Sequence, residues 1–135
     1  MNTAEVIYQG YLRSECTHLH SGVKIVTDAP TDNFGKGEAF SPTDLVAIAL
    51  ASCMITTVGI LTRLENIHLE GSKLMVIKIM ESNPRRIAQV HIDIEINNPD
   101  LNEEQKRRIE EIAQNCPVAK SLHPDLIQKL TFSYN

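Results

Sequence analysis

Apolar and polar residues alternate near both ends of this sequence, which is the pattern of strands with one buried face. Partial alternation in EVIYQGYLRSECTH and GVKIVT, with a turn at Ser21 and Gly22, predicts strands within residues 4–27. The following segment, DAPTDNFGKGEAF (28–40), is rich in Asp, Pro, Asn and Gly. We therefore expect a long loop there, and loops of this length in compact domains are usually functional. The last alternating run, KLTFSYN, predicts a C-terminal strand.

The clearest alternation lies in the middle of the chain. Residues 72–82 and 86–97 are separated by Asn83, Pro84 and Arg85, and together they predict a β-hairpin with one solvated face. Every second residue of the later strand is apolar. This face consists of Ala88, Val90, Ile92, Ile94 and Ile96.

A helical pattern replaces alternation in SPTDLVAIALASCMITTVGILTRL. Ser41 is expected to cap this helix, with Pro42 in its first turn and Asp44 where a carboxylate suits the helix dipole. No charged residue occurs from Leu45 to Leu61. Because this run is short for a membrane span and contains hydroxyl residues, we interpret it as the central helix of the domain, or one shared with a partner subunit.

A second, amphipathic helix is predicted over residues 97–116. Asp100 is expected as its cap, with Glu103 as the reciprocal partner. Near-helical spacing of apolar residues turns Cys116 inward, and Pro117 breaks the helix and opens a short one, PVAKSLH. Two ion pairs are expected on the exposed side: Glu103–Arg107 and Glu104–Arg108.

Length and composition narrow the class of protein. With 135 residues, of which 42% are hydrophobic and 22% charged, the chain is predicted to form one α+β domain over residues 1–135. A net charge of −4 without a Lys/Arg cluster argues against a nucleic-acid partner. The start, MNTAEVIYQG, lacks a signal-peptide pattern, so we expect a cytoplasmic location. There, three cysteines do not indicate a disulfide framework and are left for catalysis, metal binding or packing.

Two of the cysteines lie in settings that bear on reactivity. Cys53 lies about three turns into the apolar helix, where burial should raise its pKa unless a cation, most plausibly an arginine, approaches. Cys116 precedes the helix opened by Pro117, whose unpaired N–H groups favour a thiolate. From the residues alone we therefore expect Cys116 to ionise more easily. Simple packing of a small apolar side chain is the alternative for each.

The third cysteine belongs to a possible metal-ligand set. On a strand, Cys16, His18 and His20 would share one face, and all three side chains can bind metal. Three positions spaced two apart span about 13 Å along a strand, too far to converge on one tetrahedral ion. We therefore expect no metal site and interpret these residues as solvated strand positions.

Two stretches together resemble the OsmC/Ohr family of thiol-dependent peroxidases. They are FSPTDLVAIALASC (40–53) and CPVAKSL (116–122). The expected order of strands, long loop, cysteine helix, hairpin, second helix, Cys-Pro and final strand is similar over essentially the whole chain. Within the family, TDAPTDNFGKGEAFSPTDL looks closer to an uncharacterised OsmC-like branch than to the well-studied hydroperoxide reductases.

The resemblance implies an intertwined homodimer of the OsmC-like fold. In it, central cysteine-bearing helices pack between antiparallel sheets, with an active site at each side of the subunit interface. It also implies that Cys53 attacks the peroxide and that Cys116 resolves the resulting sulfenic acid as a disulfide. An external dithiol protein, of lipoyl or thioredoxin type, would complete the cycle without a bound cofactor.

The family also places an arginine beside the reactive thiol. Arg13 matches by position, as the only arginine before the cysteine helix, although from the residues alone it would pair with Glu15. Hydroperoxide reductases carry an arginine-orienting glutamate directly after the helix-opening proline, where this chain has Thr43. Glu38 could orient the arginine instead. Asp44 matches an acidic residue found in some members, and a role as helix cap explains it equally well.

The functional expectation is a thiol-dependent peroxidase that reduces organic hydroperoxides in oxidative-stress defence. An apolar lining from Leu50 and Met54 would favour an apolar substrate over hydrogen peroxide. Thr43 in place of the glutamate motivates an alternative, a redox-sensing or small-molecule-binding protein with weak or no turnover. A third alternative is that both cysteines are structural and inert.

Overall fold

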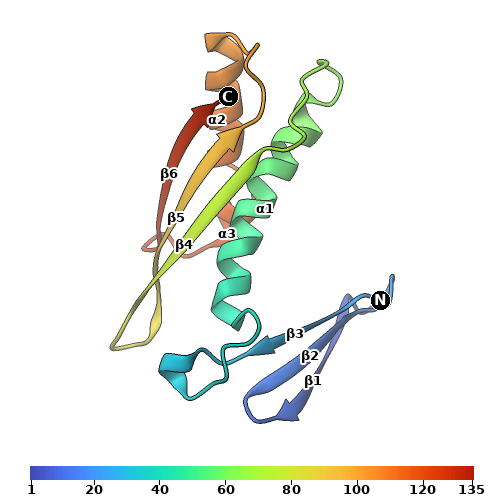
Figure 1. Cartoon of the computed structure of the whole chain (residues 1–135), viewed down its shortest axis with the longest axis vertical. Coiled ribbons are helices and arrows are strands. Elements are labelled where there is room, and N and C mark those ends of the chain that lie inside the picture. The colour runs from blue at the N-terminus through green and yellow to red at the C-terminus, as the bar shows by residue number, and fades with distance from the viewer. The chain divides into compact units, whose positions relative to one another are not determined.

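The computed structural model describes all 135 residues, which divide into two compact units, residues 1–46 and 47–135. The boundary falls inside the helix α1 (Pro42–Thr62), so one continuous helix contributes to both units (Figure 1). The mixture of helices and small sheets confirms the α+β class. The single domain over 1–135 stays a prediction.

The N-terminal unit is built on a three-stranded antiparallel sheet in the order β1-β2-β3. Tyr11 and Leu12, both with positive φ, form the tight turn between the first two strands. The register of the second pair places Arg13 directly opposite Asp28. The strands are β1 (Ala4–Gly10), β2 (Arg13–His18) and β3 (Lys24–Asp28).

The long loop that follows is closed on itself. Its only regular structure is a 3-10 turn, η1 (Thr31–Asn33). The backbone N–H of Asp28 donates to the carbonyl of Phe40 at 3.1 Å and so joins the two ends of the loop. Inside the loop, a Cβ added to Gly35 would lie 1.7 Å from the Ala29 carbonyl oxygen, so this close approach requires glycine.

The C-terminal unit contains a second three-stranded sheet, in the order β4-β5-β6. The predicted hairpin is confirmed, because the first two strands pair antiparallel. The implied all-antiparallel arrangement is wrong for this sheet, since the last strand runs parallel to β5. The chain returns to the sheet through two helices, and such a crossover is what a parallel neighbour needs. The elements are β4 (Lys73–Glu81), β5 (Arg86–Ile96), α2 (Glu103–Gln114), α3 (Pro117–Ser121) and β6 (Ile127–Tyr134).

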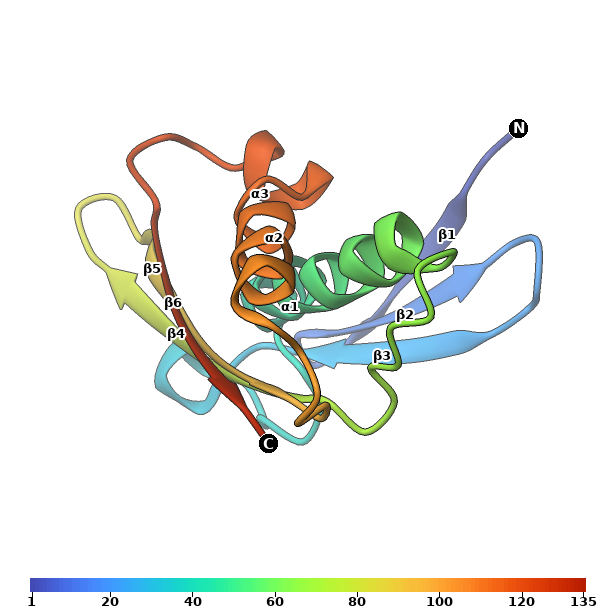
Figure 2. The same ribbon diagram turned by 90° about the horizontal axis from the view of Figure 1, so that it is seen from above.

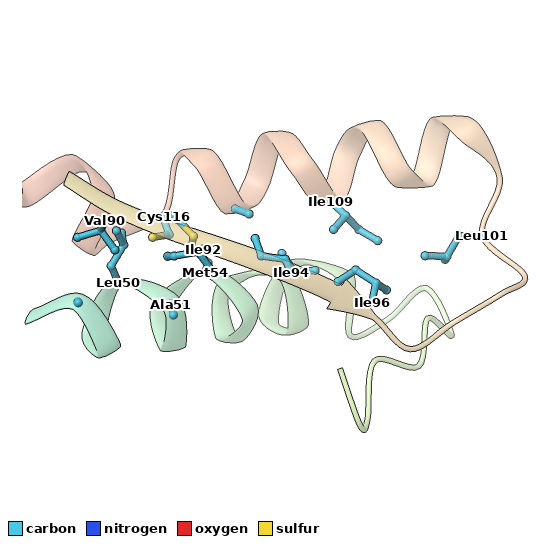
Figure 3. Close-up of a cluster of buried hydrophobic side chains, with 13 residues drawn as sticks. Leu50, Ala51, Met54, Val90, Ile92, Ile94, Ile96, Leu101, Ile109 and Cys116 are labelled. Carbon is cyan, nitrogen blue, oxygen red and sulfur yellow. The ribbon is translucent and has the colours of Figure 1, made fainter. Parts of the chain in front are cut away.

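The core of this unit lies between the sheet and the helices α1 and α2, which cover the same sheet face (Figure 2). The alternation predicted for β5 is confirmed, because Val90, Ile92, Ile94 and Ile96 are all at most 2% exposed. Figure 3 shows these side chains meeting residues of both helices. The helix residues in this cluster include Leu50, Met54, Ile109 and Cys116.

The start of α2 differs from the prediction. Asn102, not Asp100, is the N-cap, and its side chain accepts a hydrogen bond from the N–H of Gln105 at 2.8 Å. Gln105 returns a bond to the Asn102 N–H at 2.9 Å, which completes a capping box. Asn and Gln serve this motif as well as acidic residues do.

The two ion pairs expected along α2 differ as well. Glu103 pairs with Lys106 one turn later at 3.4 Å. Arg108 pairs with Glu65, which lies outside α2, and not with Glu104. It also donates a hydrogen bond to the Leu61 carbonyl at 3.0 Å. Arg108 therefore caps the C-terminal end of α1, whose last carbonyls lack helical partners.

The cysteine-bearing helix α1 begins as predicted. Ser41 and Asp44 form a reciprocal cap, with bonds of 2.9 and 3.0 Å between each side chain and the other residue's backbone N–H. By length and composition alone α1 could cross a membrane, and only 33% of its most apolar window is buried within the chain. A largely uncovered apolar helix needs a covering surface.

Candidate active site

The structure brings the two predicted thiols of the C-terminal unit together. Cys53 comes from α1 and is half-buried, whereas Cys116 lies between α2 and α3 and is 0% exposed. Cys53 packs against the buried cluster that contains Cys116, and each thiol shifts the pKa of the other. Figure 3 shows Cys116 directed into the cluster that also holds Leu50 and Met54. No disulfide joins them in this structure.

The surroundings of Cys53 favour its thiolate. Burial alone would raise the pKa of this thiol. Three neighbouring donors outweigh burial and hold the pKa below its ordinary value: the Val118 N–H, the Thr57 hydroxyl and the Cys116 thiol. The Thr57 oxygen lies 3.7 Å from the sulfur. Within this unit, neighbouring donors therefore lower the pKa of Cys53 without a cation.

Cys116 is affected in the opposite direction. Burial is the largest influence and raises its pKa, and the bond to Cys53 and the charge there raise it further. The Ala119 N–H, 3.5 Å from the Cys116 sulfur, lowers the pKa but does not compensate. The expectation that Cys116 ionises more easily is therefore wrong. The Val118 N–H of α3 lowers the pKa of both thiols, so the difference between them comes mainly from the deeper burial of Cys116 and from the charge on Cys53.

Arg13, in the N-terminal unit, is oriented by Asp28. Its guanidinium donates two hydrogen bonds to the Asp28 carboxylate, at 2.7 and 2.8 Å. The Asp28 side chain is 1% exposed, and the bond from Arg13 holds the pKa of this carboxyl below its ordinary value. The expected pairing of Arg13 with Glu15 is wrong, because Glu15 instead contacts Lys24 at 3.3 Å.

The other acidic candidates support this pair or the helix cap. The backbone N–H of Glu38 donates to Asp28 at 3.1 Å, and the negative charge of Glu38 acts on Arg13 without a direct bond. Asp44 belongs to the cap of α1. Thr43 contacts Ser41 at 3.2 Å through its hydroxyl. The carboxylate that binds the arginine therefore comes from the end of a strand and not from the start of the cysteine helix.

Comparisons with known proteins identify the family of this chain. A family model described as OsmC-like protein matches residues 35–129, a span that includes both thiols. The chain belongs to the OsmC-like family. The comparison with curated proteins found no match.

Solved structures of OsmC-like proteins resemble the whole chain. A protein from Psychrobacter arcticus, provisionally described as an osmotic stress induced and detoxification response protein, is 49% identical, with a TM-score of 0.94 and coverage of 98% of this chain and 96% of that one. The organic hydroperoxide resistance protein OsmC of Legionella pneumophila is 18% identical, with a TM-score of 0.72 and coverage of 98% of each chain. OhrB of Bacillus subtilis is also 18% identical, with a TM-score of 0.64 and coverage of 98% of each chain. At such identity these two support the fold alone.

The third cysteine of this OsmC-like chain belongs to the N-terminal unit, on β2. Cys16 is opposite Val6 and Ile25, and the nearby His18 contacts the Ser21 hydroxyl at 2.6 Å. No group of three or more His, Cys, Asp or Glu side chains is arranged to hold a metal ion. The absence of a metal or cofactor stays a prediction, as does the role of each site residue.

Sequence reasoning missed Asp28, Thr57 and the N–H of Val118. Thr57 could have been found, because it follows Cys53 by four residues and so shares its helix face. The role of Asp28 could be predicted only from the register of the strands, and the role of the Val118 N–H only from the packing of α3 against α1. Leu50 and Met54, expected to line a substrate site, are at most 1% exposed and belong to the packed core.

Proposed function

We propose that this OsmC-like protein is a thiol-dependent peroxidase that reduces organic hydroperoxides through Cys53 and Cys116. One observation supports this most strongly: the two thiols pack in one cluster, and their surroundings lower the pKa of Cys53 and raise that of Cys116. A nucleophilic thiolate beside a protonated resolving thiol is the arrangement that such a cycle requires.

The chemistry follows from this pairing. The Cys53 thiolate attacks the distal oxygen of ROOH, so an S–O bond forms, the O–O bond breaks, and the alkoxide takes a proton and leaves as an alcohol. Cys116 then attacks the Cys53 sulfenic acid. The S–S bond forms, and the hydroxyl departs as water with the Cys116 proton. Cys53 loses two electrons to the peroxide, which an external dithiol must restore.

Arg13 completes the proposal as the cation near the peroxide. Its bonds to Asp28 fix the guanidinium plane and leave Arg13 32% exposed, so it keeps donors for a second oxygen ligand. In this role it would polarise the peroxide and favour the thiolate. The role of Arg13 comes from the family resemblance.

A homodimer is part of the proposal. Much of α1 is uncovered within one chain, including Ile60 and Leu61, which are 51% and 50% exposed. Large apolar side chains of the N-terminal sheet are also exposed, with Val6 and Tyr8 both at 64%. A second copy of the chain would bury such surface. Light scattering coupled to size exclusion should give twice the monomer mass, and a monomer at micromolar concentration would overturn this part.

The decisive experiment is stopped-flow reduction of cumene hydroperoxide, with hydrogen peroxide as the comparison. We expect fast oxidation of the wild type, no reaction in Cys53→Ser, and a single turnover ending at sulfenic acid in Cys116→Ser. Dihydrolipoamide and reduced thioredoxin, tested separately, identify which dithiol class restores the enzyme. Cys53→Ser reacting as fast as wild type would remove Cys53 from the mechanism.

A second candidate is a redox sensor or small-molecule-binding protein with weak turnover. It is favoured by Thr43, whose hydroxyl contacts Ser41 where hydroperoxide reductases have a glutamate. It predicts slow peroxide consumption but a Cys53–Cys116 disulfide detectable by mass spectrometry after mild oxidation. Rapid dithiol-dependent turnover excludes it. For either function the reducing cytoplasm is the suitable compartment, because dithiols are available there.

A further inference from the structure

Thr57 lies one helical turn after Cys53 on the same face of α1. Its hydroxyl oxygen is 3.7 Å from the Cys53 sulfur, within hydrogen-bond range for sulfur. Thr57 and Cys53 are both half-buried, so bulk water competes weakly for this contact.

A second threonine of the same helix makes the hydrogen bond that is usual for a threonine hydroxyl inside a helix. The Thr62 hydroxyl donates to the Val58 carbonyl, four residues earlier, at 2.8 Å. This back-bonding is the usual choice for threonine inside a helix. The Thr57 hydroxyl instead reaches the sulfur four residues earlier. The two threonine hydroxyls of α1 therefore have different partners, a backbone carbonyl for Thr62 and a sulfur for Thr57.

The Thr57 contact gains strength when Cys53 ionises. A neutral thiol is a weak acceptor, whereas a thiolate is charged and binds a hydroxyl donor more strongly. A thiolate has no proton to donate, so Thr57 must then be the donor. Of the three donors around this sulfur, Thr57 is the one that can be changed without altering the backbone of α3 or the second thiol.

We propose that Thr57 is a catalytic residue: its hydroxyl donates a hydrogen bond to the Cys53 sulfur, holds it beside Cys116 and stabilises its negative charge. This inference rests on the proposed peroxidase function. The donor acts twice in the cycle, first on the attacking thiolate and again when reduction releases Cys53 as a thiolate leaving group. Between these steps, in the sulfenic acid and the disulfide, the sulfur carries no charge and the bond weakens.

The test uses the thiol alone, without peroxide. The full-length wild type is compared with Thr57→Val, which is isosteric but lacks the hydroxyl, and with Thr57→Ser, which keeps it. Thr56→Val is the matched control, because Thr56 is the exposed neighbour on the same helix. Alkylation of Cys53 by iodoacetamide is followed across pH by peptide mass spectrometry, which separates this thiol from Cys16 and Cys116.

In Thr57→Val we expect the midpoint of the alkylation profile at higher pH and a rate at pH 7 about three- to tenfold lower, from loss of one bond to a charged group. Thr57→Ser and Thr56→Val should follow the wild type. An unchanged midpoint in Thr57→Val overturns the inference. If Thr57→Val fails to fold, as judged by its thermal melt, Thr57→Ala removes the same hydroxyl and is read in the same way.

The peroxide assay then separates this inference from the proposed function. If the wild type reduces cumene hydroperoxide, kcat/KM should fall in Thr57→Val in parallel with the thiolate fraction. If kcat/KM is unchanged while the thiolate fraction falls, Thr57 has no part in catalysis and the inference fails. A wild type that consumes no hydroperoxide refutes the function, and with it the catalytic role, whereas the alkylation profile still decides whether Thr57 stabilises the thiolate.

Discussion

Arg13 and Asp28 face each other across β2 and β3 and are joined by two hydrogen bonds, of 2.7 and 2.8 Å. The carboxylate is buried, and it also accepts a bond from the Glu38 N–H. A planar guanidinium held through two of its N–H donors cannot rotate freely. In this chain the arginine is therefore held by its own sheet, and a glutamate at the start of α1 is not needed to orient it.

The first prediction follows for activity. Asp28→Asn keeps the size of the side chain but removes its charge, so Arg13 should lose its fixed orientation. We expect kcat/KM for cumene hydroperoxide to fall about ten- to a hundredfold, as small misplacements of a positioning group do. Glu15→Gln is the control, because Glu15 shares the sheet face of Arg13 but contacts Lys24. Equal activity in both variants would show that Asp28 does not orient a catalytic arginine.

The second prediction concerns pH. The pKa of Asp28 is lowered in the folded state, chiefly by its bond to Arg13, so the folded state binds fewer protons than the unfolded chain. The stabilisation is fully present above the unfolded value of about 3.9 and is lost as pH falls through the lower folded value. Urea unfolding from pH 6 to pH 2.5 should show a shallower acid decline in Asp28→Asn than in wild type. Parallel declines would contradict this linkage.

The sequence predicted what depends on local pattern. Alternation located β5 and its buried face, and the run from Ser41 to Asp44 located the start of α1. It was wrong where two local signals compete, as at Asp100 and Asn102, since either residue type can cap a helix. The cap is the residue whose side-chain oxygen reaches the first free N–H groups of the helix, here the Asn102 amide, and the backbone path into the helix decides which residue that is.

Tertiary contacts explain the remaining errors. The pairing of Arg13 with Asp28 depends on strand register, which the sequence of one strand does not contain. The order of thiol pKa values depends on which N–H of α3 meets which sulfur. The Val118 N–H lowers the pKa of both thiols, whereas Cys116 is the more deeply buried of the two. Only the packed structure supplies these facts.

The third prediction tests the revised cap of α2. Asn102→Ala removes the side-chain half of the capping box with Gln105 and should lower the free energy of unfolding by about 1 kcal/mol. Asp100→Ala is the control, because the bond of Asp100 to Asn98 uses its backbone N–H and survives the change. Urea denaturation measures both. A larger loss in Asp100→Ala would restore Asp100 as the cap.

The fourth prediction concerns which sulfur the reductant attacks. Leaving-group chemistry favours attack on Cys116, because Cys53 has the lower pKa and would depart more easily. Solvent access favours attack on Cys53, because Cys116 is 0% exposed whereas Cys53 is half-buried. A sulfur that no thiol can approach in line cannot react, so we expect access to decide and Cys53 to carry the mixed disulfide. The displaced Cys116 sulfur is met by the Ala119 N–H, which partly stabilises its charge.

A monothiol makes this choice visible, since its adduct carries no second thiol in the same molecule to displace it and persists long enough to be trapped. Oxidised wild-type protein treated with glutathione and quenched in acid should carry the adduct on the peptide that contains Cys53. Cys116→Ser, oxidised in the presence of glutathione, supplies the reference adduct at that position. An adduct found mainly on Cys116 would mean that the segment around α3 opens before reduction, since the closed arrangement of the two thiols gives a reductant no path to that sulfur.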